Sequence, residues 1–410
     1  MGKWVEQFLG NLIIEEKKST IQVQGASNFG DYPFFTSGDS VLIHDKYLVD
    51  GEKLFLATGG KANIKFYNGK AAYSTDTYVI SSEKASTQYL YYYLLNQIDF
   101  INSNLFTGSG LKHLQKNDFK KFKFKLPEEK PEQTRIAQIL SKADAAIAQT
   151  EALISKYQRI KTGLMQDLLT KGIDEHGNIR SEQTHRFKTE KGLRVPEEWD
   201  VDCIDNLETA VLDFKANGSF ETLTANVKYY YDQNYARLIR LTDLRNGLKF
   251  DGVFIDEKGF QFLKKTRLVE GDILISCVGE YTGFVCQMPK VPYQATIAPN
   301  MFVVRFKDTV VNSYAYRYMT SSQFQNQILV VSTSSATKLL NNPNLRSLKL
   351  AIPPKEEQIA IATKFDKVER LINEYKVSLE KLQFIKTGLM QDLLSGKVRV
   401  KIKEETLVNT

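Results

Sequence analysis

Two stretches of the chain carry apolar side chains at alternating spacings of four and three residues. They are Ile136–Leu168 and Ile361–Leu393, and a lysine (Lys161, Lys386) interrupts both at the same step. An apolar seam of period 3.5 is typical of a coiled coil, whereas a helix packed on its own domain shows a broader stripe. The pattern predicts two helices of roughly 50 Å that pair with each other. A long surface helix packed on its own domain is the alternative.

The pattern before each long helix changes to short runs typical of mixed α/β structure. Strands are predicted at Lys53–Ala57, Asp272–Val278 and Met301–Phe306, between turns rich in Gly, Asn and Asp. Tyrosine-rich helices are predicted at Thr87–Ile98 and Asn312–Leu329.

The chain is a tandem repeat. The ten letters IKTGLMQDLL occur at Ile160–Leu169 and again at Ile385–Leu394, 225 residues apart. Other pairs keep the same order in both halves: Glu132-Gln133 with Glu357-Gln358, Tyr89, Tyr91 and Tyr93 with Tyr314, Tyr316 and Tyr318, Lys112 with Lys338, and Trp4 with Trp199. The second copy holds about thirty extra residues, most of them between Leu207 and Gly271. Such a repeat predicts two copies of one structural unit.

Six segments follow from the repeat. Residues 1–127 form a first globular domain, 128–170 a long helix, 171–195 a linker, 196–353 a second globular domain, 354–395 a second long helix, and 396–410 a tail. The tail stands where the linker stood in the first copy, so we predict that it returns toward the first domain. A pseudo-twofold axis would then relate the halves.

Composition narrows the class of protein without naming it. No apolar run reaches the ~18 residues of a membrane helix, and MGKWVEQFLGN does not read as a signal peptide. The three cysteines form no CxxC pair, which argues against a disulfide framework or zinc site and favours a reducing cytoplasm. The net charge of +7 is compatible with nucleic acid without requiring it.

The motifs that could support catalysis or cofactor binding are incomplete in this sequence. FTGSG at Phe106–Gly110 resembles the loop with which methyltransferases hold S-adenosylmethionine, but no supporting strand, ribose-binding acid or catalytic Pro-Pro-aromatic loop accompanies it. No P-loop is complete, and no catalytic triad recurs in both halves. We therefore expect no cofactor, no metal and no catalysis in this chain. Polar, aromatic loops such as VGEYTGF suit DNA contacts, and suit sugars or peptides nearly as well.

The combination of features resembles the specificity (S) subunit of type I restriction–modification systems. The resemblance rests on two diverged domains, each followed by an EQ-headed seam helix ending in KTGLMQDLL, and it covers essentially the whole chain. It implies α/β (α+β) target recognition domains in tandem, with the helices paired as an antiparallel coiled coil. It also implies a subunit that reads a bipartite, asymmetric DNA target in the prokaryotic cytoplasm. The alternative is a coiled-coil adaptor with two carbohydrate- or peptide-binding heads.

The same resemblance implies partners and their cofactors. Two methyltransferase (M) subunits would dock on the helices and hold S-adenosylmethionine, and endonuclease (R) subunits would use ATP and magnesium. We predict that eight residues of the two decamers contact the partner: Gly163, Met165, Gln166, Leu169, Gly388, Met390, Gln391 and Leu394. A glycine within a helix costs about 1 kcal/mol relative to alanine, so close helix approach is predicted at Gly163. The alternative is that the two decamers are identical only because the two helix seams pair with each other.

DNA-contacting residues are predicted from their chemistry. Arginine or lysine reads guanine, Asn or Gln reads adenine, and lysine binds phosphate. The first domain has no arginine, so we predict contacts from Asn28, Lys61, Asn63, Lys65, Asn68, Lys70 and Lys112. In the second domain the predicted contacts are Arg237, Arg240, Arg245 and Lys338, with both Lys112 and Lys338 assigned to phosphates.

Overall fold

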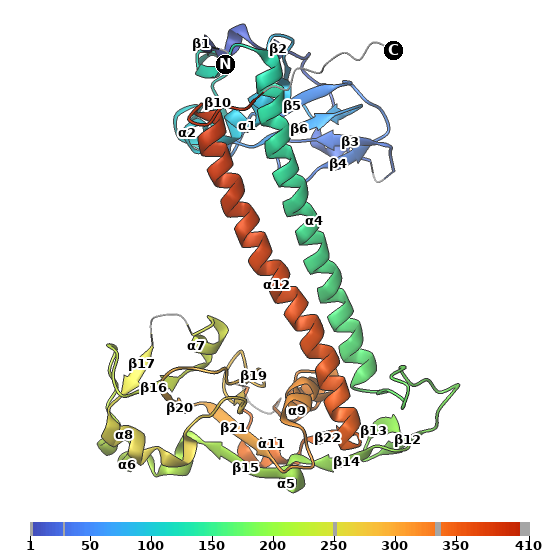
Figure 1. Ribbon diagram of the computed structural model, residues 1–410, viewed down its shortest axis with the longest axis vertical. Coiled ribbons are helices and arrows are strands. Elements are labelled where there is room, and N and C mark those ends of the chain that lie inside the picture. The colour runs from blue at the N-terminus through green and yellow to red at the C-terminus, as the bar shows by residue number, and fades with distance from the viewer. Residues whose placement is uncertain (1–2, 28, 249–251, 333–337, 402–410) are drawn as a thin grey trace. The chain divides into compact units, whose positions relative to one another are not determined.

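The computed structural model describes residues 3–27, 29–248, 252–332 and 338–401. The chain forms two compact units, residues 1–154 with 375–410 and residues 155–374. Each unit contains one globular domain together with a part of both long helices (Figure 1). Among the described residues, no helix is long and apolar enough to cross a membrane.

The first domain is built from two small sheets and a terminal strand pair. A four-stranded antiparallel sheet has the order β2-β8-β5-β6, and a three-stranded sheet has the order β4-β3-β7, in which β3 is antiparallel to β4 and parallel to β7. The first strand pairs with the last, β1 with β11. The strands are β1 (Trp4–Phe8), β2 (Ile14–Glu15), β3 (Tyr32–Phe35), β4 (Leu42–His44), β5 (Glu52–Ala57), β6 (Ile64–Asn68), β7 (Ala72–Tyr73), β8 (Thr77–Ser81), β9 (Phe106–Thr107), β10 (His113–Leu114) and β11 (Lys123–Pro127).

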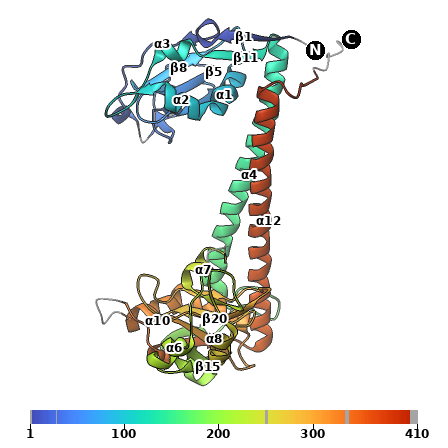
Figure 2. The ribbon, with the colours of Figure 1, turned by 90° about the vertical axis from the view of Figure 1, so that its left-hand side faces the viewer.

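Helices α1 (Thr87–Asn96), α2 (Ile98–Asn104) and α3 (Lys116–Lys120) complete the first domain. Figure 2 shows α1 and α2 beside strands β5 and β8. The pleat of β5 explains how one strand serves two cores, because successive side chains point to opposite faces. Leu54 and Leu56 pack with α1, whereas Phe55 between them packs with Phe35 of the smaller sheet.

The second domain repeats this topology. Its four-stranded sheet has the order β15-β21-β18-β19, its three-stranded sheet the order β17-β16-β20, and β14 pairs with β22. The strands are β14 (Asp200–Cys203), β15 (Glu208–Asp213), β16 (Ala236–Ile239), β17 (Val253–Ile255), β18 (Ile273–Ser276), β19 (Val285–Gln287), β20 (Gln294–Ile297), β21 (Met301–Phe306) and β22 (Lys349–Ile352). In the linker, β12 (Phe187–Glu190) pairs with β13 (Leu193–Pro196). The predicted duplication is confirmed at the level of strand order.

The helices of the second domain include those of the extra residues. The domain contains α5 (Ile204–Leu207), η3 (Phe214–Asn217), α6 (Phe220–Asn226), α7 (Leu241–Arg245), α8 (Glu257–Phe262), α9 (Asn312–Met319), α10 (Ser322–Ser332) and α11 (Asn342–Ser347). Between Leu207 and Gly271, α6 and α8 build a further apolar core against β16 and β17. The single helix predicted over residues 312–329 is wrong, because the hydroxyl of Ser321 accepts a hydrogen bond from the Phe324 amide and starts α10 anew.

The two long helices are α4 (Lys130–Leu168) and α12 (Lys355–Leu394). Every seam position is buried or half-buried, and the predicted coiled coil is confirmed. The seam lysines form equivalent ion pairs: Lys386 lies 2.5 Å from Asp144 in one unit, and Lys161 lies 2.6 Å from Glu369 in the other. The beginning of α4 thus meets the end of α12, and the reverse holds in the second unit. The helices are antiparallel.

Candidate nucleic-acid interface

One turn recurs at the same place in both domains. It joins β5 to β6 in the first domain and β18 to β19 in the second, and a glycine in the left-handed region lies within each: Gly60 (φ 84°) and Gly279 (φ 87°). The Gly60 amide donates to the Lys112 carbonyl at 2.8 Å, and the Gly279 amide donates to the Lys338 carbonyl at 3.1 Å. Lys112 and Lys338 therefore occupy equivalent positions, each on the backbone that supports the turn. Both side chains are exposed.

The first domain gathers only some of its predicted DNA-contacting residues at this turn. Lys61 is exposed within it, and Asn63 ends it with its side-chain amide donating to Asp39 at 2.7 Å. Asn68 and Lys70 lie at the opposite end of the β5–β6 hairpin, where the Lys70 ammonium lies 4.8 Å from the ring centroid of Tyr47. Lys61 and Lys112 are exposed at this turn and Asn63 is half-buried there, whereas Asn68 and Lys70 lie apart from them.

Two other predictions in the first domain need correction or fall outside the structure. The Lys65 ammonium donates to the carbonyls of Thr36 and Gly38, and burial lowers its pKa. Lys65 therefore fastens the neighbouring loop to the hairpin, and the prediction that it contacts DNA is not supported by its geometry. Asn28 lies outside the described residues.

The structure separates the three predicted arginines of the second domain. Arg237 is 4% exposed and donates to Asp243, to the Leu248 carbonyl and to the Tyr293 hydroxyl. The prediction that Arg237 contacts DNA is wrong, because its guanidinium is buried in an ion pair. Arg240 also binds Asp243, through Nε at 2.9 Å and Nη2 at 2.8 Å. Pairs of this kind hold an arginine in place and occupy the donors that would face a base.

Arg245 differs from both. It is exposed at the end of α7, and its guanidinium carbon lies 3.8 Å from the ring centroid of Tyr281. Tyr281 belongs to the recurrent turn of the second domain and lies between Gly279 and Thr282. The Thr282 hydroxyl donates to the Lys338 carbonyl at 3.0 Å. The structure thus brings Arg245 and Lys338 to one turn. The sequence showed Tyr281 only as an aromatic residue in a Gly-flanked loop, so its partner could not be named.

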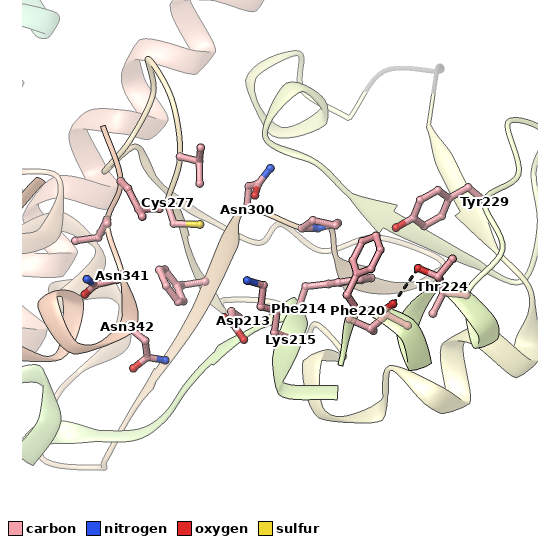
Figure 3. A pocket seen from close by; sticks show the side chains of 17 residues that line it. Asp213, Phe214, Lys215, Phe220, Thr224, Tyr229, Cys277, Asn300, Asn341 and Asn342 are labelled. Carbon is pink, nitrogen blue, oxygen red and sulfur yellow. Dashed lines mark hydrogen bonds between the residues drawn. The ribbon is translucent and has the colours of Figure 1, made fainter. Parts of the chain in front are cut away.

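A cavity of about 620 Å³ lies beside this turn in the second domain (Figure 3). One wall comes from the extra residues, including Phe214, Phe220 and Tyr229, and the other from Cys277 and Phe302 of the shared sheet. Burial raises the pKa of the Cys277 thiol to about 11, so the sulfur stays protonated and unreactive near neutral pH. In the described part of the chain, no cluster of His, Cys, Asp and Glu could hold a metal ion.

The decamers end inside the domains. Leu168 and Leu169 belong to the core of the second domain, and Leu393 and Leu394 to the core of the first. The prediction that Leu169 and Leu394 contact a partner is therefore wrong, since they are 0% and 3% exposed. Their burial gives a physical reason for the identical letters, because each decamer packs on the domain that precedes the other long helix.

The remaining decamer residues stay near the surface. Met165 and Met390 are half-buried against these same cores, and Gln166 and Gln391 are exposed. A Cβ placed on Gly163 or Gly388 would meet no atom within 4 Å. The close helix approach predicted at Gly163 is therefore not made by another described segment of this chain. Each glycine leaves open space on the helix surface.

The EQ motif, Glu132-Gln133 and Glu357-Gln358, has a structural role that the sequence did not explain. Gln133 accepts from the Ser86 amide at 2.9 Å and donates to the Pro127 carbonyl at 2.7 Å; Gln358 accepts from the Val311 amide at 2.7 Å and donates to the Pro353 carbonyl at 2.8 Å. Each glutamine thereby joins its domain to the start of the long helix.

The glutamate of the motif holds the segment that follows the other helix. Glu357 binds Arg180 of the linker and accepts from the indole of Trp199 at 3.1 Å. Glu132 binds Arg399 of the tail with both carboxylate oxygens, at 2.6 and 2.7 Å. The predicted return of the tail toward the first domain is thus observed for its described residues, 396–401.

The two domains share one fold, and each has an exposed lysine beside a turn that contains glycine. Both domains are attached to the same coiled coil. These features define a scaffold with two recognition domains. The family described as "Type I restriction modification DNA specificity domain" matches residues 1–158 and 196–381. The chain belongs to this family, and it is a DNA-recognition specificity subunit of a type I restriction–modification system.

Similar proteins agree with this assignment. The type I restriction enzyme MjaVIII specificity subunit of Methanocaldococcus jannaschii is 25% identical, over 97% of this chain and 93% of that protein. The EcoDI specificity subunit of Escherichia coli is 23% identical, over 89% of this chain and 81% of that protein. The crystal structure of the S subunit from M. genitalium shares the fold, with a TM-score of 0.65 and 14% identity over 98% of this chain and 97% of that chain.

Proposed function

We propose that this subunit reads a bipartite, asymmetric DNA sequence, with one half-site for each domain. The observation that carries the proposal is the recurrent turn. In both domains a glycine amide of the turn donates to the carbonyl of the equivalent lysine, Lys112 or Lys338, while the side chains of the turn differ. In this proposal, the turns of both domains bind phosphate in the same way, and their different side chains face the bases. Such an arrangement suits two half-sites of different sequence.

We further propose that the open decamer surfaces receive two copies of one partner, the methyltransferase subunit. The repeat gives the two units equivalent patches, in which Gly163 with Gln166 on α4 matches Gly388 with Gln391 on α12. Two copies of one protein require two matched patches, which explains why residues without an internal contact are identical. Endonuclease subunits would join this core.

In this proposal the chain itself performs no catalysis. The methyltransferase partner supplies S-adenosylmethionine and the endonuclease partner supplies ATP and magnesium, with the assembly working in the prokaryotic cytoplasm. Support comes from the family match, because both domains match the model of a DNA specificity domain.

Mapping of modified adenines tests the proposal. Genomic DNA from a host that expresses this chain with its methyltransferase partner should carry adenine methylation in one split motif. Exchange of residues 1–127 for another subunit's domain should change one half of that motif only. Methylation in an unsplit motif, or a change in both halves after the exchange, would contradict it.

A further inference from the structure

The arginines of the second domain are nearly all engaged in internal hydrogen bonds. Of the seven arginines in residues 196–353, six donate to side chains of this chain. The pairs are Arg237 and Arg240 with Asp243, Arg267 with Gln261, Arg305 with Asp272, Arg317 with Asp366 and Glu369, and Arg346 with Asp205 and Glu208. Within the described part of the chain, Arg245 is the one arginine of this domain whose guanidinium has no hydrogen-bond acceptor.

Arg245 is nevertheless held in place. Its guanidinium carbon lies 3.8 Å from the centroid of the Tyr281 ring, which is the shortest cation–ring distance found among the described residues. Stacking on an aromatic face orients the planar group but leaves its N–H donors, which lie in the plane and point outward, available. An exposed side chain with five free donors and a fixed plane is prepared for an acceptor that this chain does not supply.

The position of the pair identifies the acceptor's source. Tyr281 lies in the recurrent turn, two residues from Gly279, whose amide binds the Lys338 carbonyl. Arg245 therefore stacks on the turn whose backbone is bonded to the carbonyl of Lys338, the exposed lysine that we assign to phosphate. In a DNA duplex, the acceptor that matches a flat guanidinium is the O6 and N7 edge of guanine in the major groove.

We infer that Arg245 reads a guanine of the second half-site and that Tyr281 is its positioning residue. This inference rests on the proposed function and deepens it. The first domain contains no arginine, so its half-site must be read by other side chains. The two half-sites then differ in their chemistry as well as in their letters.

Selection from a random duplex library tests the inference, with the chain bound to its methyltransferase partner. The wild type should select a split motif with a guanine at one position of the second half-site. Arg245→Ala should lower discrimination at that position by ~10- to 100-fold and leave the other positions unchanged. Arg245→Lys should keep part of the discrimination, because a lysine supplies charge without the bidentate geometry.

Variants at Tyr281 examine the positioning role. Tyr281→Phe retains the ring and should select the wild-type motif. Tyr281→Leu should relax the same guanine position less than Arg245→Ala does, with thermal unfolding unchanged. Arg267→Ala is the matched control, because Arg267 also stacks on a ring (Phe260, 4.5 Å) but is bonded to Gln261. It should leave the motif unchanged.

The outcomes separate this inference from the function on which it rests. If the wild type selects no sequence, the proposed function fails. If the wild type selects a split motif and Arg245→Ala selects the same one, or loses affinity for all sequences equally, Arg245 does not read a base. If Arg267→Ala relaxes the same position, the effect reflects disturbance of the domain, and the inference is overturned.

Discussion

Glu132 and Arg399, which are 267 positions apart, form a two-pronged ion pair whose shorter distance is 2.6 Å. The glutamate is 2% exposed. Its counterpart Glu357 binds Arg180 in the same manner, so the start of each long helix holds the segment that follows the other long helix. The described part of the tail, residues 396–401, is therefore fastened to the first unit.

Breaking this pair should destabilise the first unit. Arg399→Met leaves a buried carboxylate without its partner and should lower the free energy of unfolding by about 2–4 kcal/mol. Adding Glu132→Gln should recover part of the loss, because the amide needs no counter-charge. Urea unfolding of the two single variants and the double variant measures the coupling. Strict additivity would show that the two side chains do not interact.

Variants at the decamer glycines distinguish an effect on folding from an effect on association with the partner. Gly163→Leu together with Gly388→Leu should raise helix stability, since leucine is a better helix former by roughly 0.5–1 kcal/mol per site and the added side chain has room. The same change should abolish association with the methyltransferase partner on size-exclusion chromatography. Lys142→Leu with Lys367→Leu is the matched control, at exposed and equivalent positions outside the decamers. A complex that persists with the glycine variant would place the partner elsewhere.

The two turn lysines should act on all sequences alike. Lys112→Ala or Lys338→Ala removes an exposed ammonium while the carbonyl that supports the turn remains. We expect weaker binding to specific and nonspecific DNA, and a salt dependence reduced by about one unit of slope for each lysine. Titrations at several salt concentrations provide the measurement. Loss of affinity at a single base pair would mean that the lysine reads a base.

Arg240 should matter for stability and not for selectivity. Its guanidinium donates to Asp243, which is 3% exposed and also binds Arg237. Arg240→Ala should lower the melting temperature of the second unit, because part of the support of a buried carboxylate is lost. The selected DNA motif should stay the same as in the wild type. Relaxation of one base position would return Arg240 to the set of reading residues.

The sequence by itself determined the features that depend on local spacing. The alternation of four and three residues predicted both long helices and their pairing, and the ordered matches such as Lys112 with Lys338 predicted two copies of one domain. These features follow from the fixed geometry of a helix or strand, so they are visible in any stretch long enough to show the period. The family resemblance rests on the same matches.

Only the tertiary structure decided which polar side chains are free. Arg237, Arg240 and Arg245 are equivalent by residue type, but Asp243 engages the first two and Tyr281 holds the third. Leu169 lies off the helix seam and is nevertheless buried, because a domain core covers it. Such partners come from segments far apart in the chain, and no spacing rule links them. Their chemistry becomes specific only when folding brings the segments together.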